Sequence, residues 1–214
     1  MRDALAKKYI RGRGIEIGGL HCPLPVPPGA RVIYIDRLPP GEAHPDVKTV
    51  VHEVVIDDAE TLRTVIPGSC DFVIANHVLE HCHDPIGTLN AWRRSLVVGG
   101  IIYAAVPEKT QTFDAPRAVT TLQHVIDDHV LGTHDGRDAE HYHEWLRIID
   151  KIQEPERSKL VAHCLETRAN IHFHVWDRPA MRELLDWVCP RVGLELLEFA
   201  ENGAEVIWIL RKLP

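Results

Sequence analysis

The sequence predicts an α/β protein built on one doubly wound, mostly parallel sheet of seven strands. Short β-branched runs alternate with helix-like stretches through the first half of the chain, which is the pattern of parallel strands joined by crossover helices. These runs are apolar on both faces, as expected for strands that lie between two layers of helices. The pair Asn202-Gly203 near the end is a strong hairpin signal and adds two antiparallel strands.

The first five strands and their helices are expected within residues 1–107. The predicted strands are 15–18, 32–36, 50–55, 71–76 and 101–106. Helices are predicted at 3–10, 59–65 and 85–96, the last because Pro85 follows Asp84, a pairing typical of a helix N-terminus. Between the first two strands, four prolines within six positions (23–28) exclude a helix, so this crossover must be an irregular loop.

Residues 108–178 change character and predict a helical insertion after the fifth strand. They are rich in His, Asp and Thr, with helices expected at 121–130, 140–152 and 156–164 and an extended segment at 171–176. A helix at 178–188, capped by Asp177, and strands at 194–199 and 205–210 close the chain. We expect one domain over 1–214, in which residues 1–107 hold the parallel strands and 179–214 hold the closing helix and hairpin.

Composition limits the class of protein and its partners. The chain has 214 residues, 45% of them hydrophobic, and a net charge of −7, which makes nucleic acid a poor partner. The five cysteines show no C-x-x-C pair, the N-terminus lacks a signal-peptide pattern, and no apolar run is long enough to insert into a membrane. A cytoplasmic protein is therefore expected. Eight of the 14 histidines fall between residues 120 and 175.

Two features at strand ends point to a nucleoside. Gly18 and Gly19 follow the first strand, where glycine lets the backbone turn sharply and approach a ligand. Asp36 ends the second strand, where a carboxylate can accept hydrogen bonds from both ribose hydroxyls. Each feature alone is also typical of a structural turn and a solvated acid, so the prediction depends on the motifs that lie further along the chain.

Three such motifs occur in a set order. Residues 58–60 read Asp-Ala-Glu, 71–81 form a strand that continues as Val-Leu-Glu-His, and 96–100 end in a glycine pair. Over residues 10–107 the sequence therefore resembles the class I S-adenosylmethionine-dependent methyltransferases, which implies a Rossmann-like fold. More narrowly, 140–145 and 172–176 are similar to signatures of a bacterial branch that methylates sugar and glycan hydroxyls. The sequence departs from the family's first motif, because Leu20 and Cys22 stand where further glycines are usual.

The resemblance implies a crevice for S-adenosylmethionine at the carboxyl edge of the sheet. The residues expected to line it are Glu16, Gly18, Gly19, Asp36, Arg37, Asp58, Ala59, Asn76, His77 and His81.

The expected reaction is transfer of the methyl group to a hydroxyl of a small acceptor, preferably a saccharide or glycan precursor. A hydroxyl is a poor nucleophile until it loses its proton, so a histidine base is expected in the insertion, which overhangs the carboxyl edge. On a helix, His141, Glu144 and Trp145 share one face and could supply a base, an orienting carboxylate and an aromatic platform. The predicted catalytic residues are His141, Glu144 and His174. The predicted acceptor contacts are Tyr142, Trp145, His172 and His124.

Several alternatives remain open from the sequence. The acceptor atom could be nitrogen, carbon or a phenol, or the domain could bind the cofactor without catalysis. Residues 77–81 also match the H-x-x-E-H zinc-protease pattern, although such a match arises readily by chance in a chain with 14 histidines. Phe113, Asp114 and Arg117 are candidates for acceptor contact by position alone. We assign no metal ligands, although a divalent cation could orient a sugar diol. Both a small molecule and an oligosaccharide are compatible acceptors, and a homodimer is left open.

Overall fold

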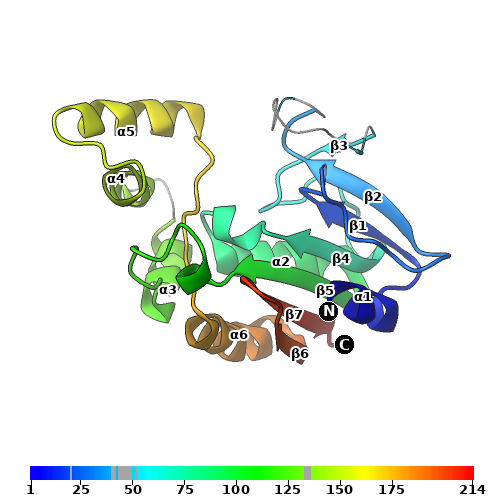
Figure 1. The fold of residues 1–214 in the computed structure, drawn as a ribbon. Coiled ribbons are helices and arrows are strands. Elements are labelled where there is room, and N and C mark those ends of the chain that lie inside the picture. The colour runs from blue at the N-terminus through cyan, green and yellow to red at the C-terminus, as the bar shows by residue number, and fades with distance from the viewer. Residues whose placement is uncertain (20, 40–41, 43–49, 52, 133–135) are drawn as a thin grey trace.

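The computed structural model describes residues 1–214 except 20, 40–41, 43–49, 52 and 133–135. Its centre is a seven-stranded sheet in the order β3-β2-β1-β4-β5-β7-β6 (Figure 1). The strands are β1 (Arg13–Ile17), β2 (Arg31–Asp36), β3 (Val55–Ile56), β4 (Cys70–Asn76), β5 (Leu96–Pro107), β6 (Leu194–Glu201) and β7 (Glu205–Lys212).

Six α-helices and two 3₁₀ turns surround the sheet in the described part of the chain. The helices are α1 (Arg2–Tyr9), α2 (Pro85–Ser95), α3 (Leu122–Leu131), α4 (Arg137–Ile148), α5 (Glu156–Thr167) and α6 (Arg178–Val192), and the 3₁₀ turns are η1 (Leu79–His81) and η2 (Lys109–Gln111). Among the described residues, no helix is long and apolar enough to cross a membrane.

The sheet is doubly wound, as the sequence predicted. β1 pairs in parallel with both β2 and β4, so the chain proceeds outward in one direction through β2 and β3 and then returns to the other side of β1. β5 continues the parallel sheet, whereas β7 runs antiparallel to β5 and forms the predicted hairpin with β6. The reversal of strand order between β1 and β4 is the place where open α/β sheets bind ligands, at the carboxyl ends of the strands.

Apolar side chains fill both faces of the sheet. On one face a large core includes Trp92 of α2, Leu184 of α6 and Trp208 of β7. On the other face a smaller core joins α1 to the central strands through Ala6, and includes Leu24 from the proline-rich loop. The aspartates predicted to cap α2 and α6 do so, because the Asp84 and Asp177 carboxylates each accept a backbone amide in the first turn of the helix.

The helical insertion lies beyond the carboxyl ends of the strands, where α4 and α5 stand apart from the sheet (Figure 1). These two helices pack together around a third core, to which Tyr142, Val161 and Phe173 contribute. The chain then returns toward the sheet along residues 168–177, and the only strand-like pairing within this described segment is a bridge between Trp176 and Glu108. The insertion therefore covers the edge where the sequence places the cofactor.

Two expected elements differ in the structure, and the Val-Leu-Glu-His motif adopts a turn. Residues 59–65 form turns instead of a helix, because the Asp57 carboxylate accepts the backbone amides of Arg63 and Thr64 and holds the chain in a local loop. Of the strand predicted at 50–55, only Val55 is in β3, and residue 52 lies outside the described part of the chain. The Val-Leu-Glu-His motif forms the single 3₁₀ turn η1 and not an α-helix.

Candidate active site

Four of the predicted cofactor residues meet at the carboxyl ends of β1, β2 and β4. Ile17 is in register with Ile35 and Ala75, so the residues that come after each of these positions lie at the same edge of the sheet. These residues are Gly18 and Gly19 after β1, Asp36 at the end of β2 and Asn76 at the end of β4.

The turn after β1 requires glycine at both positions. Gly18 has a φ of +71°, a conformation that side chains rarely adopt. A Cβ at Gly19 would lie 2.8 Å from the carboxyl carbon of Glu16, so a larger residue would displace this buried side chain. Glycine at both positions therefore lets the chain turn tightly over the buried Glu16 side chain.

Some polar atoms at this edge make no hydrogen bond to the described residues. Both polar atoms of the Asn76 side chain are buried and make no hydrogen bond to a described residue. The Asp36 carboxylate accepts one backbone amide, from Leu38, through Oδ1 at 3.2 Å. Buried polar groups are normally paired, and an unpaired amide beside a partly free carboxylate is typical of a ligand site. These donors and acceptors fit a nucleoside with ribose hydroxyls and ring nitrogens.

The loop after β3 completes this edge. Asp58 uses Oδ1 to accept the amide of Glu60 at 2.8 Å. The carbonyl of Ala59 accepts the indole N–H of Trp92 at 2.8 Å, which fixes the loop against the main core. The loop that the sequence assigns to adenine is thereby held by its own backbone and by a buried tryptophan.

Glu16 supports the glycine turn from below. Its side chain is buried, and Oε1 accepts the backbone amide of Leu24 at 2.8 Å. Burial raises the pKa of Glu16 to about 7. Glu16 thus lies directly against Gly19, and its buried Oε2 makes no hydrogen bond to a described residue.

Arg37 links the sheet edge to the insertion. Its Nη1 donates to the carbonyl of Arg168, just after α5, at 3.3 Å. The end of β2 and the end of α5 therefore lie side by side, and the helical insertion closes over the side of the sheet where Asp36 is found.

His77 and His81 point in different directions. His77 has a φ of +56°, and its Nε2 lies 2.9 Å from Glu205 while its Nδ1 lies 3.5 Å from Glu80. Burial opposes protonation, but these two carboxylates raise the pKa of His77 to about 9. His81 instead donates from Nδ1 to the carbonyl of Ile171 at 2.9 Å. The two rings have separate partners, and no group of possible metal ligands among the described residues contains both, so the geometry does not support the zinc-protease alternative.

Asp114 and His172 form a hydrogen-bonded pair next to this edge. Asp114 is buried, and its Oδ2 lies 2.6 Å from Nδ1 of His172. Although burial opposes it, the hydrogen bonds from His172 and Arg117 lower the pKa of Asp114. Arg117 lies 3.1 Å from Asp114 and also donates to the carbonyl of His172 at 2.7 Å. The imidazole is therefore fixed both through its ring and through its backbone.

Aromatic rings surround His172. The ring centroids of His81, Phe113 and Trp145 lie 4.6, 5.0 and 6.0 Å from that of His172. Phe113 is 56% exposed, so this group reaches the surface. The predicted aromatic platform on α4 is thus placed beside His172.

The predicted face of α4 points inward, but its partners differ from those expected. Glu144 accepts from Nη2 of Arg117 at 2.8 Å, and Asp128 is the carboxylate that lies beside His141. Tyr142 is 1% exposed, and its hydroxyl donates to the carbonyl of Ala169, so it packs within the insertion and is closed to an acceptor.

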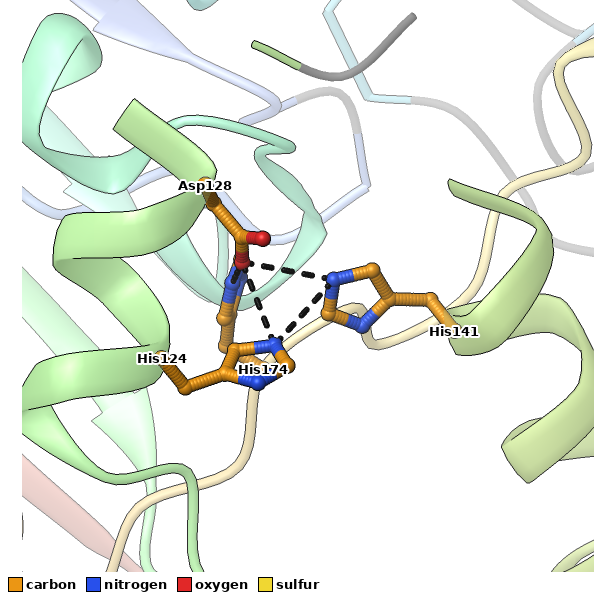
Figure 2. A group of neighbouring side chains, drawn as sticks. All are labelled: His124, Asp128, His141 and His174. Carbon is orange, nitrogen blue, oxygen red and sulfur yellow. Dashed lines mark hydrogen bonds and ion pairs between the residues drawn. The ribbon is translucent and has the colours of Figure 1, made fainter. Parts of the chain in front are cut away.

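Three of the predicted histidines converge on Asp128, as Figure 2 shows. His141 and His174 are buried, and His124 is partly exposed. Burial lowers the pKa of His174 to about 4. Burial alone would raise the pKa of Asp128, but hydrogen bonds from the surrounding histidines and from Arg137 lower it. We refer to His124, Asp128, His141 and His174 as the three-histidine cluster. A cavity of about 290 Å³ lies beside it.

Asp128, Glu80 and Glu205 are the site residues that the sequence did not indicate. For Asp128 a signal was present, since His124 and Asp128 are four residues apart on a predicted helix and so share a face. Glu80 lies within the Val-Leu-Glu-His motif, and its buried carboxylate makes no hydrogen bond to a described residue. Glu205 could not be found in this way, because its role depends on the pairing of β5 with β7.

Comparisons with known proteins bear on the fold. Residues 14–104 match the family model of a methyltransferase domain. Among solved structures, the complex of the Trm112 methyltransferase activator with a methyltransferase from Haloferax volcanii is 14% identical, covers 99% of this chain and 88% of that chain, and has a TM-score of 0.55. An S-adenosylmethionine-dependent methyltransferase from Methanosarcina mazei is also 14% identical, with 96% of this chain and 95% of that chain covered and a TM-score of 0.53.

A third structure, from Thermotoga maritima, is described as an S-adenosylmethionine-dependent methyltransferase and possible histamine N-methyltransferase. It is 14% identical, with 94% of this chain and 83% of that chain covered and a TM-score of 0.51. No curated protein matches the sequence. At these identities the structural likeness concerns the fold.

The sheet order and the matched domain together define a Rossmann-like methyltransferase fold. Residues 14–104 match the model of a methyltransferase domain, and S-adenosylmethionine-dependent methyltransferases are among the proteins that share this fold. S-adenosylmethionine is the cofactor of this class, and the glycine turn, Asp36 and the unpaired Asn76 fit its nucleoside.

Proposed function

We propose that the protein methylates a hydroxyl group of a small saccharide or glycan precursor, with His172 as the general base. The observation that carries this proposal is the pair formed by Asp114 and His172, whose facing atoms are 2.6 Å apart. The predicted base, His141, belongs instead to the three-histidine cluster, where Asp128 lies 3.4 Å from its Nε2.

The hydrogen bond to Asp114 selects the state of His172 that a base needs. A carboxylate that accepts from Nδ1–H keeps the proton on that nitrogen and leaves the lone pair on Nε2. Among the described residues, none forms a hydrogen bond with Nε2 of His172, and the side chain is 12% exposed. His172 can therefore receive a proton at Nε2 from an acceptor hydroxyl that comes within hydrogen-bond distance.

The protein's contribution to such a transfer is position and proton removal. When bound, S-adenosylmethionine supplies a methyl group on a positively charged sulfur, so the donor is already activated. Arg117 and Asp114 hold the imidazole, and His172 would take the hydroxyl proton at Nε2 while the methyl carbon exchanges its bond to sulfur for a bond to the hydroxyl oxygen. Asp114 stabilises the imidazolium that results, without itself accepting the proton.

The rings near His172 support a saccharide as the acceptor. Phe113 and Trp145 meet edge to face at 5.8 Å and flank His172. Aromatic faces pack well against the C–H faces of sugar rings, and the polar residues of the insertion can bind the remaining hydroxyls. Arg117, the cation beside these rings, is already paired with Asp114 and Glu144, which suits a neutral sugar better than an anionic acceptor.

The test is transfer of a radiolabelled methyl group to a panel of monosaccharides, nucleotide sugars, phenols and amines, with the product identified by mass spectrometry. We expect O-methylated sugar from the wild-type protein. His172→Gln should reduce the rate by about a hundredfold or more while binding of S-adenosylhomocysteine is retained. Asp114→Asn should also reduce the rate and alter its pH profile.

His163→Ala is the matched control, because His163 is an exposed histidine of α5 in the same insertion. It should leave the rate unchanged. Full activity in His172→Gln would refute the assignment of the base, and if His141→Ala alone lost activity the role would return to His141. Exclusive methylation of amines or phenols would refute the saccharide assignment.

A further inference from the structure

The three-histidine cluster brings together side chains from three separate segments. His124 and Asp128 lie one turn apart on α3, His141 comes from α4, and His174 comes from the segment that returns to the sheet (Figure 2). All four contribute an atom to a group in which every ligand atom lies within 4.8 Å of the others. The methyl-transfer proposal uses none of these residues.

Hydrogen bonds alone do not account for this arrangement. Nδ1 of His174 faces the carbonyl of Cys82 at 3.0 Å, and a carbonyl can only accept, so this nitrogen carries the proton. In a neutral ring Nε2 then carries a lone pair and no proton, yet it faces a carboxylate oxygen of Asp128 at 2.9 Å, where two lone pairs repel each other. Nε2 of His124 and Nε2 of His141 likewise face each other at 3.4 Å, where at most one can donate.

Three imidazole nitrogens also crowd around one carboxylate oxygen of Asp128. Oδ2 of Asp128 lies 2.9, 3.2 and 3.4 Å from the Nε2 atoms of His174, His124 and His141. Lone pairs that converge from three imidazoles and one carboxylate are the donor set of a transition-metal site. A cation at the centre turns each of these unfavourable contacts into a metal–ligand bond.

The distances match a tetrahedral ion. Zinc binds imidazole nitrogen and carboxylate oxygen at about 2.0–2.2 Å, which places neighbouring ligand atoms of a tetrahedron about 3.3–3.5 Å apart. Four separations between ligand atoms of the cluster are 2.9, 3.2, 3.4 and 3.4 Å. The two remaining separations, from His174 to His124 and to His141, lie within 4.8 Å.

We propose that the three-histidine cluster binds one transition-metal ion, with zinc as the preferred metal, through the three Nε2 atoms and Oδ2 of Asp128. A donor set of three imidazole nitrogens and one carboxylate oxygen favours zinc over magnesium or calcium, which take six or more oxygen ligands. Two of the ligands are also held from behind, since the Cys82 carbonyl accepts from Nδ1 of His174 and Arg137 binds the other oxygen of Asp128.

An entry path leads to the ion. His124 and His141 both line the cavity of about 290 Å³. The His124 side chain is 37% exposed, whereas that of His174 is fully buried, so an ion reaches the cluster from the side of the cavity. A bound ion with four protein ligands is structural, and it would tie α3, α4 and the returning segment together. This inference goes beyond the proposed function and does not rest on it.

The test is zinc binding by tag-free protein that has been stripped with a chelator and then loaded. Elemental analysis should give one zinc per chain, and zinc should raise the Tm. His141→Ala and Asp128→Asn should weaken zinc binding by about a hundredfold or more, as expected when a direct ligand is lost. With cobalt in place of zinc, the visible spectrum should be that of a tetrahedral ion.

His143→Ala is the matched control, because His143 lies on the same helix but outside the cluster. It should retain one zinc per chain. His124→Gln changes the most exposed ligand and should lose zinc while circular dichroism confirms that the protein is folded. Zinc binding that survives in His124→Gln and Asp128→Asn, absence of stoichiometric binding in the wild type, or loss of zinc only on changing His81 and His172 would each overturn the proposal.

Discussion

Arg117 is predicted to be the residue that most strongly stabilises the active-site side of the insertion. Its side chain is fully buried and pairs with Asp114 and Glu144, and it also donates to the carbonyl of His172. Arg117→Met preserves most of the volume but leaves the buried Asp114 carboxylate without its cation. Removing one partner of a buried ion pair costs about 3–5 kcal/mol. Because Glu144 is 28% exposed and can be rehydrated, we expect Arg117→Met to lower the free energy of unfolding by about 3 kcal/mol, at the low end of this range.

The assay is the free energy of unfolding in urea, measured for wild type, Arg117→Met and Arg182→Met. Arg182 forms an exposed ion pair with Asp186 at 2.8 Å, so Arg182→Met should cost less than about 1 kcal/mol. Arg117→Met should also lower kcat while leaving the affinity for S-adenosylhomocysteine unchanged, since Arg117 positions His172 and does not touch the cofactor residues. An Arg117→Met protein as stable as Arg182→Met would refute the reasoning.

Three further predictions concern stability. Trp92→Phe removes the indole donor to the Ala59 carbonyl and should cost about 1–3 kcal/mol in urea unfolding, whereas no loss would show that the bond is not needed. Asp177→Ala removes the N-cap of α6 and should cost about 1 kcal/mol, checked by thermal unfolding, and an unchanged Tm would count against the cap. The pKa of His77 is raised from 6.5 to about 9, so its charge stabilises the fold fully below pH 6.5, and this stabilisation is lost as the pH rises through 9. In His77→Gln the free energy of unfolding should therefore change less between pH 6.5 and pH 9. The same pH profile in the variant and the wild type would contradict the assignment.

The parts of the fold that depend on local signals could be predicted from the sequence. Asp84 and Asp177 mark helix starts because a cap acts within one turn, and Asn202-Gly203 marks the hairpin because the turn requires φ above zero at glycine. The glycines after β1 and the aspartate at the end of β2 could also be assigned to one site from the sequence, since parallel strands align their carboxyl ends.

The partners of the histidines could not be predicted in this way. His141 and Glu144 share a face of α4 as expected, but their partners, Asp128 and Arg117, come from other segments. Residues 59–65 have an apolar spacing that suits a helix, yet Asp57 competes for their amides. Such outcomes depend on three-dimensional packing, which a single sequence does not reveal.

The most direct test of the account is a calorimetric titration with S-adenosylhomocysteine. The wild-type protein should bind one molecule per chain, and Asp36→Ala should weaken binding markedly, because Asp36 is the carboxylate placed to hold the ribose. Asp186→Ala, an exposed aspartate of α6, should bind like the wild type. A wild-type protein that shows no binding, or equal affinity in Asp36→Ala, would contradict the placement of the nucleoside at the ends of β1 and β2.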